Sequence, residues 1–139
     1  MTLRAADLEV GTVFERVVVD DLKRTQLVMY SGASGDFHPF HSDEIFAKAA
    51  GSPRGVFGHG MFTMAVTGRL LTDTVGDGRL TSYTARFIGQ IWPGDTLTTR
   101  ATVVGLDDDS GSPRVELEIE TRTQDDVVVL SGRATARAD

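Results

Sequence analysis

The segment that decides the fold runs from Met61 to Val75 and reads MFTMAVTGRLLTDTV. Its apolar side chains surround much of the helical circumference, which predicts a helix buried on most sides rather than along one stripe. These apolar residues are Met61, Phe62, Met64, Ala65, Val66, Leu70 and Leu71. Two glycines in the next three residues, 76–78, end the helix. The sequence therefore predicts one long helix at the centre of the molecule.

After residue 78 the hydrophobic period becomes two. Val115, Leu117 and Ile119 alternate with glutamates, which is typical of a strand with one dry and one wet face. Similar patterns predict strands over residues 80–91, 96–106 and 127–136. The segments between these strands are rich in glycine, proline and aspartate, which form turns. We therefore expect the last sixty or so residues to form an antiparallel meander.

Upstream of the long helix, residues 12–20 are rich in β-branched residues and predict a first strand. A short helix is predicted from 22 to 31, begun by an aspartate at 20 or 21, and another from 43 to 50, capped by Ser42. These elements predict an α+β protein that resembles the hot-dog fold, in which an antiparallel sheet wraps around a long central helix. One domain, 1–139, is expected. Because a single sheet leaves an open edge, we expect a dimer with joined sheets.

Composition narrows the functional classes. The chain has 139 residues, of which 40% are hydrophobic and 24% charged, and its formal net charge is −6. This charge disfavours nucleic acid and anionic membranes as partners, and no apolar run is long enough to span a bilayer. Cysteine is absent, which excludes disulfides and a thiolate nucleophile. The N-terminus lacks the apolar core of a secretory signal, so we expect a cytoplasmic protein.

The chemistry-bearing motif is GDFHPFH, residues 35–41. It places a carboxylate, Asp36, and an imidazole, His41, five residues apart, with Pro39 between them to prevent a regular helix. Our interpretation is that Asp36 and His41 form an acid/base pair that acts on water. The same two residues are also compatible with a structural hydrogen bond.

A second motif, GHGM at residues 58–61, precedes the long helix. Its second glycine, Gly60, is expected at the helix N-terminus, where unpaired backbone N–H groups and the positive end of the dipole can hold a developing oxyanion. An acid/base pair together with an oxyanion site suits chemistry next to a carbonyl group.

The segment YSGASGDFHPFHSDE, residues 30–44, followed by GHGM, resembles the motif of the MaoC-like (R)-specific enoyl-thioester hydratases and dehydratases. The resemblance extends from about residue 30 to 95 and covers the later strands in pattern only. It implies a hydro-lyase that adds water reversibly to trans-2-enoyl thioesters of coenzyme A or acyl carrier protein, giving the (R)-3-hydroxyacyl thioester. It also implies that no metal and no cofactor take part.

By the same resemblance, Asp36 and His41 match the catalytic pair, and Gly60 matches the glycine whose backbone N–H binds the thioester carbonyl. We further predict that four apolar residues near these positions contact the substrate. They are Phe37, Phe40, Phe57 and Met61. The chain departs from the family pattern at His38, where asparagine is common. A homodimer or higher homo-oligomer is expected, and a heterodimer is also compatible.

Several alternatives remain open. The three histidines, of which His38 and His41 are three residues apart, and a carboxylate are the residue types of a zinc site. Pro39 and the lack of further carboxylates at a fitting spacing disfavour the ligand geometry. A thioesterase on the same fold would deliver water to the carbonyl carbon instead. A non-catalytic subunit, such as the stabilising half of a heterodimeric dehydratase, is disfavoured by the intact pair. We expect His59 to brace the glycine turn through a ring N–H bonded to a backbone carbonyl, and Arg86 to lie on a solvated strand face.

Overall fold

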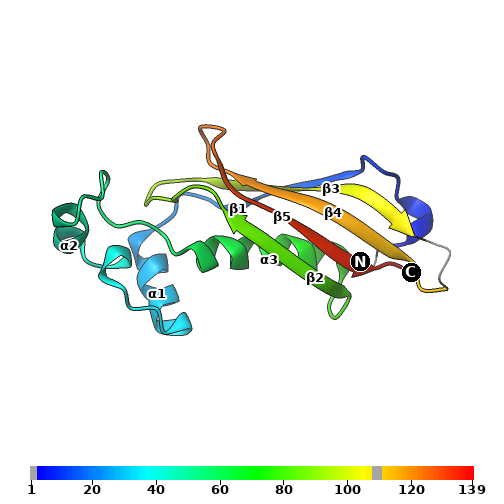
Figure 1. Cartoon of the computed structure of the whole chain (residues 1–139), viewed down its shortest axis with the longest axis horizontal. Coiled ribbons are helices and arrows are strands. Elements are labelled where there is room, and N and C mark those ends of the chain that lie inside the picture. The colour runs from blue at the N-terminus through cyan, green and yellow to red at the C-terminus, as the bar shows by residue number, and fades with distance from the viewer. Residues whose placement is uncertain (1–2, 108–110) are drawn as a thin grey trace.

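In the computed structural model, which describes residues 3–107 and 111–139, five antiparallel strands form one sheet and a long helix lies along one of its faces (Figure 1). The long helix is α3, Gly60–Val75. The strands are β1 Val13–Val19, β2 Leu80–Phe87, β3 Leu97–Asp107, β4 Arg114–Arg122 and β5 Val128–Arg137. Their order across the sheet is β1-β3-β4-β5-β2. The predicted combination of a wrapped antiparallel sheet and a long helix is therefore present.

The predicted meander is correct for β3, β4 and β5 but wrong for β2, which crosses to the far edge and pairs with β5. The connection between β2 and β3 explains this path. The Gly94 N–H donates to the Leu22 carbonyl and the Leu22 N–H donates to the Asp95 carbonyl, both at 2.8 Å. Because Leu22 follows β1, these bonds bring the start of β3 beside β1 rather than beside β2.

The shorter helices are α1, Arg24–Ser34, and α2, Glu44–Ala49, with single 3-10 turns at Ala5–Asp7 and Pro39–His41. Both cap predictions were wrong. Helix α1 is capped at Lys23, whose N–H donates to the Gln26 side chain at 2.9 Å, and α2 is capped by Asp43, whose carboxylate accepts from the Phe46 N–H at 2.9 Å. Across the described ranges, no helix combines the length and apolarity needed to cross a membrane.

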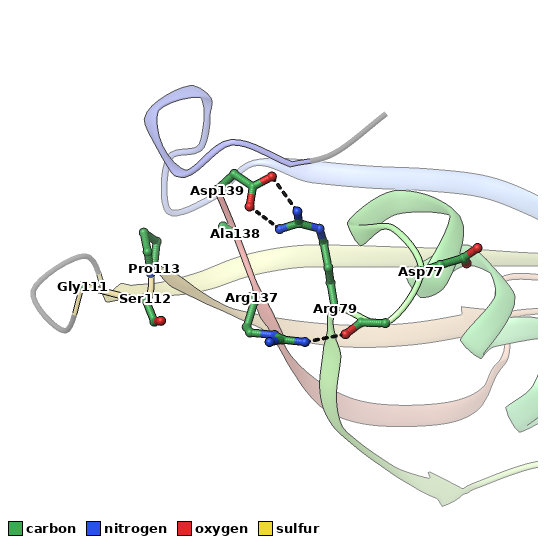
Figure 2. Close-up of a pocket in the computed structure, with 9 residues that line it drawn as sticks. Asp77, Arg79, Gly111, Ser112, Pro113, Arg137, Ala138 and Asp139 are labelled. Carbon is green, nitrogen blue, oxygen red and sulfur yellow. Dashed lines mark hydrogen bonds and ion pairs between the residues drawn. The ribbon is translucent and has the colours of Figure 1, made fainter.

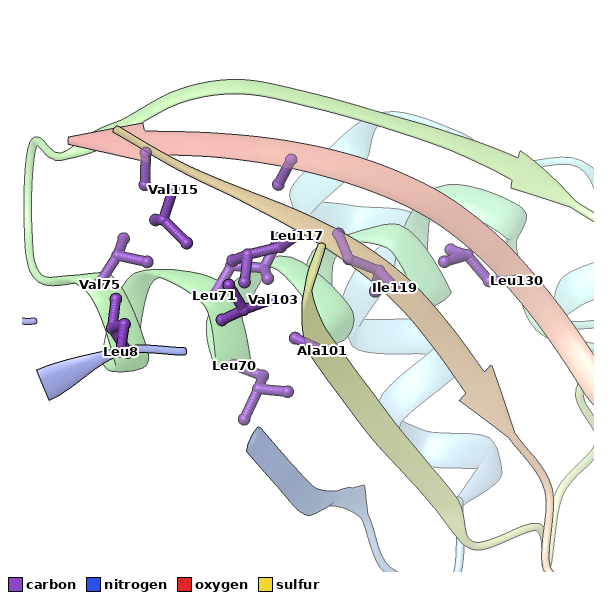
Figure 3. Close-up of a cluster of buried hydrophobic side chains, with 12 residues drawn as sticks. Leu8, Leu70, Leu71, Val75, Ala101, Val103, Val115, Leu117, Ile119 and Leu130 are labelled. Carbon is purple, nitrogen blue, oxygen red and sulfur yellow. The ribbon is translucent and has the colours of Figure 1, made fainter. Parts of the chain in front are cut away.

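The main hydrophobic core lies between α3 and the concave face of the sheet (Figure 3). Leu71 and Val75 of α3 are fully buried there, in the same cluster as Val115, Leu117 and Ile119 of β4. The prediction that α3 is buried on most sides was wrong for a single chain, because only one of its faces meets the sheet and Met61 stays 55% exposed. The exposed side of the helix carries Met61, Ala65, Arg69 and Asp73, so it is apolar only toward its N-terminal end.

A chain of buried hydroxyl groups also joins α3 to the sheet. The Thr67 hydroxyl lies 2.6 Å from that of Thr121, which lies 2.8 Å from that of Thr99, and all three residues are fully buried. The Tyr83 hydroxyl donates to the Met64 carbonyl at 2.9 Å, and burial raises the pKa of Tyr83 to about 12. These bonds satisfy polar groups inside the core and link the helix to strands on both sides of it.

Leu71→Ala should lower the free energy of unfolding by about 2–5 kcal/mol, because it removes a fully buried side chain from the core. Chemical denaturation followed by circular dichroism measures the change. Arg69→Ala on the exposed side of the same helix is the matched control and should change it by less than about 0.5 kcal/mol. Equal effects of the two substitutions would contradict the assigned core.

Candidate active site

The two sequence motifs lie against each other at the N-terminal end of α3. The Phe57 N–H donates to the Phe40 carbonyl at 3.1 Å, and the His41 Nδ1 lies 2.7 Å from the Phe57 carbonyl oxygen. Because a carbonyl oxygen only accepts, His41 carries a proton on Nδ1. The neutral ring then presents the lone pair of Nε2. The fold thus fixes both the orientation and the tautomer of His41.

Asp36 and His41 converge as the sequence predicted. The Nε2 of His41 lies 3.9 Å from the Asp36 Oδ2, which is too long for a direct hydrogen bond. One water oxygen can hydrogen bond both atoms across such a distance. The His41 side chain is 11% exposed, whereas that of Asp36 is 51% exposed. The pair therefore has a sheltered imidazole and a carboxylate that opens to solvent in the single chain.

His59 lies directly behind this pair. Its ring stacks on that of His41, with centroids 3.8 Å apart and planes inclined by 23°, and the residue is only 2% exposed. The His59 Nε2 lies 3.2 Å from the Asp36 carbonyl oxygen and 3.1 Å from the Ser31 Oγ. The predicted ring N–H bond to a backbone carbonyl is therefore present, and its acceptor belongs to Asp36. The contact with His41 was not foreseen.

The protonation state of His59 follows from these contacts. Nε2 carries the proton because the Asp36 carbonyl accepts it, so the neutral ring has its lone pair on Nδ1. That atom is buried and has no hydrogen-bond partner among residues 3–107 and 111–139. Burial, and to a lesser extent the neighbouring His41, lower the pKa of His59 below its usual range. His59 is therefore neutral at neutral pH.

Gly60 is the first residue of α3, and its N–H is one of those that a helix leaves without an internal acceptor. A Cβ atom at this position would lie 2.8 Å from the ring of Phe87, which is too close. At Gly58 a Cβ would lie 2.4 Å from the Ile91 side chain. Both glycines therefore let the chain pass close to the sheet end and carry the start of α3 to the two histidines.

The predicted substrate contacts divide into two groups. The Phe57 ring lies 5.2 Å from those of both Phe40 and His41, so these aromatic rings form one wall of the site. Phe37 and Met61 are instead 71% and 55% exposed. In a single chain the site is therefore walled on one side and open on the other.

The arrangement is poorly suited to zinc. The His38 Nδ1 already accepts from the Phe40 N–H at 3.3 Å. Ligand atoms of Asp36, His41 and His59 do lie within 4.8 Å of one another. However, the two imidazole planes are nearly parallel, so their lone pairs do not converge on one tetrahedral centre. The geometry suits proton transfer better than metal binding.

A polar hollow of about 440 Å³ lies at the opposite end of α3 (Figure 2). Its arginines are already bonded to protein groups. Arg79 makes two bonds of 2.6 Å to the Asp139 carboxylate, and Arg137 donates to the Gly78 carbonyl at 2.8 Å. It contains none of the motif residues and is about 24 Å away along the helix. The paired motifs remain the candidate site.

The fold and this site define a family. The model of the MaoC like domain matches residues 6–125, so the chain belongs to that family, and the resemblance seen in the motifs is confirmed. Among curated proteins, it is 39% identical over 101 residues to the enoyl-CoA hydratase ChsH3 of Mycobacterium tuberculosis, which covers 70% of this chain and 32% of that protein. It is also 36% identical over 108 residues to the fatty acid synthase subunit beta of Saccharomyces cerevisiae, covering 76% of this chain and 5% of that protein. The chain thus spans less than a third of either relative.

Solved structures confirm the hot-dog fold. The R-hydratase PhaJ1 from Pseudomonas aeruginosa aligns with a TM-score of 0.85 at 25% identity, covering 99% of this chain and 88% of that one. The (R)-hydratase from A. caviae aligns with a TM-score of 0.83 at 24% identity, covering 95% and 98%. The fold that the sequence predicted is therefore shared along nearly the whole chain.

The neutral, buried state of His59 predicts a pH effect on folding stability. The unfolded chain takes up a proton at His59 near pH 6.5, whereas the folded chain resists it, so stability falls as the pH falls below about 6.5. His59→Phe should make the stability curve flatter between about pH 6.5 and 5. Urea denaturation at several pH values measures this. Parallel curves for the two proteins would contradict a neutral, buried His59.

Proposed function

We propose that this chain is a hydro-lyase that adds water reversibly to trans-2-enoyl thioesters, carried by coenzyme A or acyl carrier protein, to give (R)-3-hydroxyacyl thioesters. The observation that carries the proposal is the 3.9 Å spacing of the Asp36 carboxylate and the His41 Nε2 beside the N-terminus of α3. The names of the relatives, which include an enoyl-CoA hydratase and a 3-hydroxyacyl-thioester dehydratase, support the same reaction class.

The tautomer of His41 supports a role for this residue as the base in the first proton transfer. Because Nδ1–H is bonded to the Phe57 carbonyl, the Nε2 lone pair accepts a proton from a water molecule. The Asp36 carboxylate accepts a hydrogen bond from the second O–H of that water and so orients the water oxygen. The oxygen attacks the β carbon of the enoyl group, and a new C–O bond forms. His41 becomes an imidazolium beside the Asp36 carboxylate, which stabilises it.

The second half of the reaction uses the helix N-terminus. As water adds, the π electrons of the double bond move toward the carbonyl, and negative charge develops on the thioester oxygen. The Gly60 N–H, at the positive end of α3, stabilises that charge. His41 then returns its proton from Nε2 to the α carbon. All atoms of the water molecule end in the product, so no other reactant is needed.

The proposal predicts that the purified protein consumes crotonyl-CoA, with loss of the enoyl absorbance and formation of 3-hydroxybutyryl-CoA. Asp36→Asn and His41→Ala should each lower kcat by at least about a hundredfold, the usual scale for a lost acid or base group. His38→Asn, in the same loop, is the matched control and should stay within about threefold of the wild-type rate.

The products separate this reaction from the alternatives. Release of free thiol and acid would identify a thioesterase instead. Absence of hydration with enoyl groups of several lengths, on either coenzyme A or carrier protein, would overturn the proposal. Wild-type rates in Asp36→Asn or His41→Ala would remove that residue from the mechanism.

We also propose that the working unit is a homodimer, because exposed apolar residues gather near the open side of the site. Met61, Phe87 and Ile88 are 55%, 47% and 56% exposed. The neighbouring strand β2 is an edge of the described sheet, and its outer backbone groups are available for pairing. A second copy would cover these groups and close the site.

Light scattering should therefore give a mass of at least twice the 15.0 kDa of one chain. Phe87→Lys, which places a charge at this surface, should shift the mass toward that of a monomer. A wild-type protein that is monomeric at all concentrations would contradict the proposed dimer.

A further inference from the structure

We propose that His59 is a positioning residue for the acid/base pair: its buried ring fixes the His41 imidazole by stacking, and its Nε2–H fixes Asp36 through the backbone carbonyl. This inference rests on the proposed function, because it takes Asp36 and His41 as the reacting pair. It assigns a role to a residue that does not itself contact the reacting atoms.

The contacts of His59 reach both members of the pair. Its ring lies 3.8 Å from that of His41 in a nearly parallel stack. Its Nε2 lies 3.2 Å from the Asp36 carbonyl oxygen. The His59 side chain thus contacts the backbone of Asp36 and the ring of His41. The spacing between the Asp36 carboxylate and the His41 Nε2 therefore depends on this one side chain. A change of about 1 Å in such a spacing is enough to slow catalysis.

The burial of His59 is unfavourable for stability alone. Its Nδ1 is a buried acceptor without a partner in the described part of the chain, and such an atom loses its hydration without compensation. A phenylalanine ring would fill a similar volume without that cost. Packing alone therefore does not account for a histidine here, whereas the bond from Nε2–H to the Asp36 carbonyl does.

The stack also controls where a proton resides. Two imidazoles whose centroids are 3.8 Å apart repel each other if both are charged. His59 is shielded from solvent, and its ring centroid lies 4.8 Å from that of Tyr30 in an edge-to-face arrangement, whereas His41 faces the Asp36 carboxylate. A proton taken from water therefore remains on His41, from which it can be returned to the substrate.

His59 finally connects the pair to the oxyanion donor. It is the N-cap of α3 and directly precedes Gly60, so its backbone is continuous with the proposed Gly60 N–H donor. Its side chain reaches back to the loop that carries Asp36. The residue thus holds the two halves of the proposed site in one fixed relation.

Three substitutions separate the two contacts. His59→Phe keeps a ring for stacking but loses the donor, His59→Gln keeps an amide donor near the position of Nε2 but loses the ring, and His59→Leu loses both. We expect His59→Leu to lower kcat for crotonyl-CoA by at least about tenfold, with KM within about threefold, because the water is misplaced while substrate binding is kept. His59→Phe and His59→Gln should each recover part of the loss.

The control for lost stability is Val115→Ala. It removes buried apolar atoms from the core and leaves the pair untouched, so it should lower the melting temperature while kcat stays within about twofold. If His59→Leu does not fold, the comparison of His59→Phe and His59→Gln with Val115→Ala carries the test.

A second readout does not depend on activity. In nitrogen NMR spectra of the imidazole rings, the His41 signals should show the proton on Nδ1 in the wild type and should move in each folded His59 variant. Wild-type kcat together with unchanged His41 signals in the variants would overturn the inference. If the wild-type protein hydrates no enoyl thioester, the proposed function fails, and the NMR spectra still decide whether His59 positions His41.

Discussion

The packing of α3 against the concave face of the sheet is the constraint on which the rest of the structure depends. The helix buries Leu71 and Val75 in the core, and this fixes where its other end emerges. Gly58 and Gly60 allow that end to pass close to Ile91 and Phe87, which side chains at these positions would prevent. The loop from residue 36 to 41 then has a rigid surface to fold against.

Most of the architecture could be predicted because hydrophobic periodicity reports burial directly. The long helix and the strands follow from local patterns in the sequence, whereas the pairing of the two motifs follows from the resemblance to a known family. The place of β2 could not be predicted, since it depends on hydrogen bonds between Leu22 and the distant residues Gly94 and Asp95. The one-sided burial of α3 also escaped prediction, because the composition of a helix does not say how many neighbours cover it.

The candidate site, too, was only partly predictable from the sequence. The residue types identify Asp36 and His41, and the glycines identify the helix start. The stack of His59 on His41 lies outside sequence reasoning, because an imidazole between two glycines is equally consistent with a turn brace. The tautomer of His41 could not be predicted either, because it is set by the backbone carbonyl of Phe57, and every residue type carries such a group. The side-chain types suggest the reacting groups, whereas backbone carbonyl groups set the orientation and the tautomer of the imidazole.

The hydroxyl chain of Thr67, Thr121 and Thr99 has a consequence for how this scaffold can diversify. Apolar side chains tolerate sliding, but a helix shifted by one turn, about 5.4 Å, would separate these buried oxygen atoms and leave them unpaired. These three hydroxyl groups therefore set the axial position of α3 on the sheet. Surface loops can change length and composition while these buried hydroxyl groups keep the start of α3 in place.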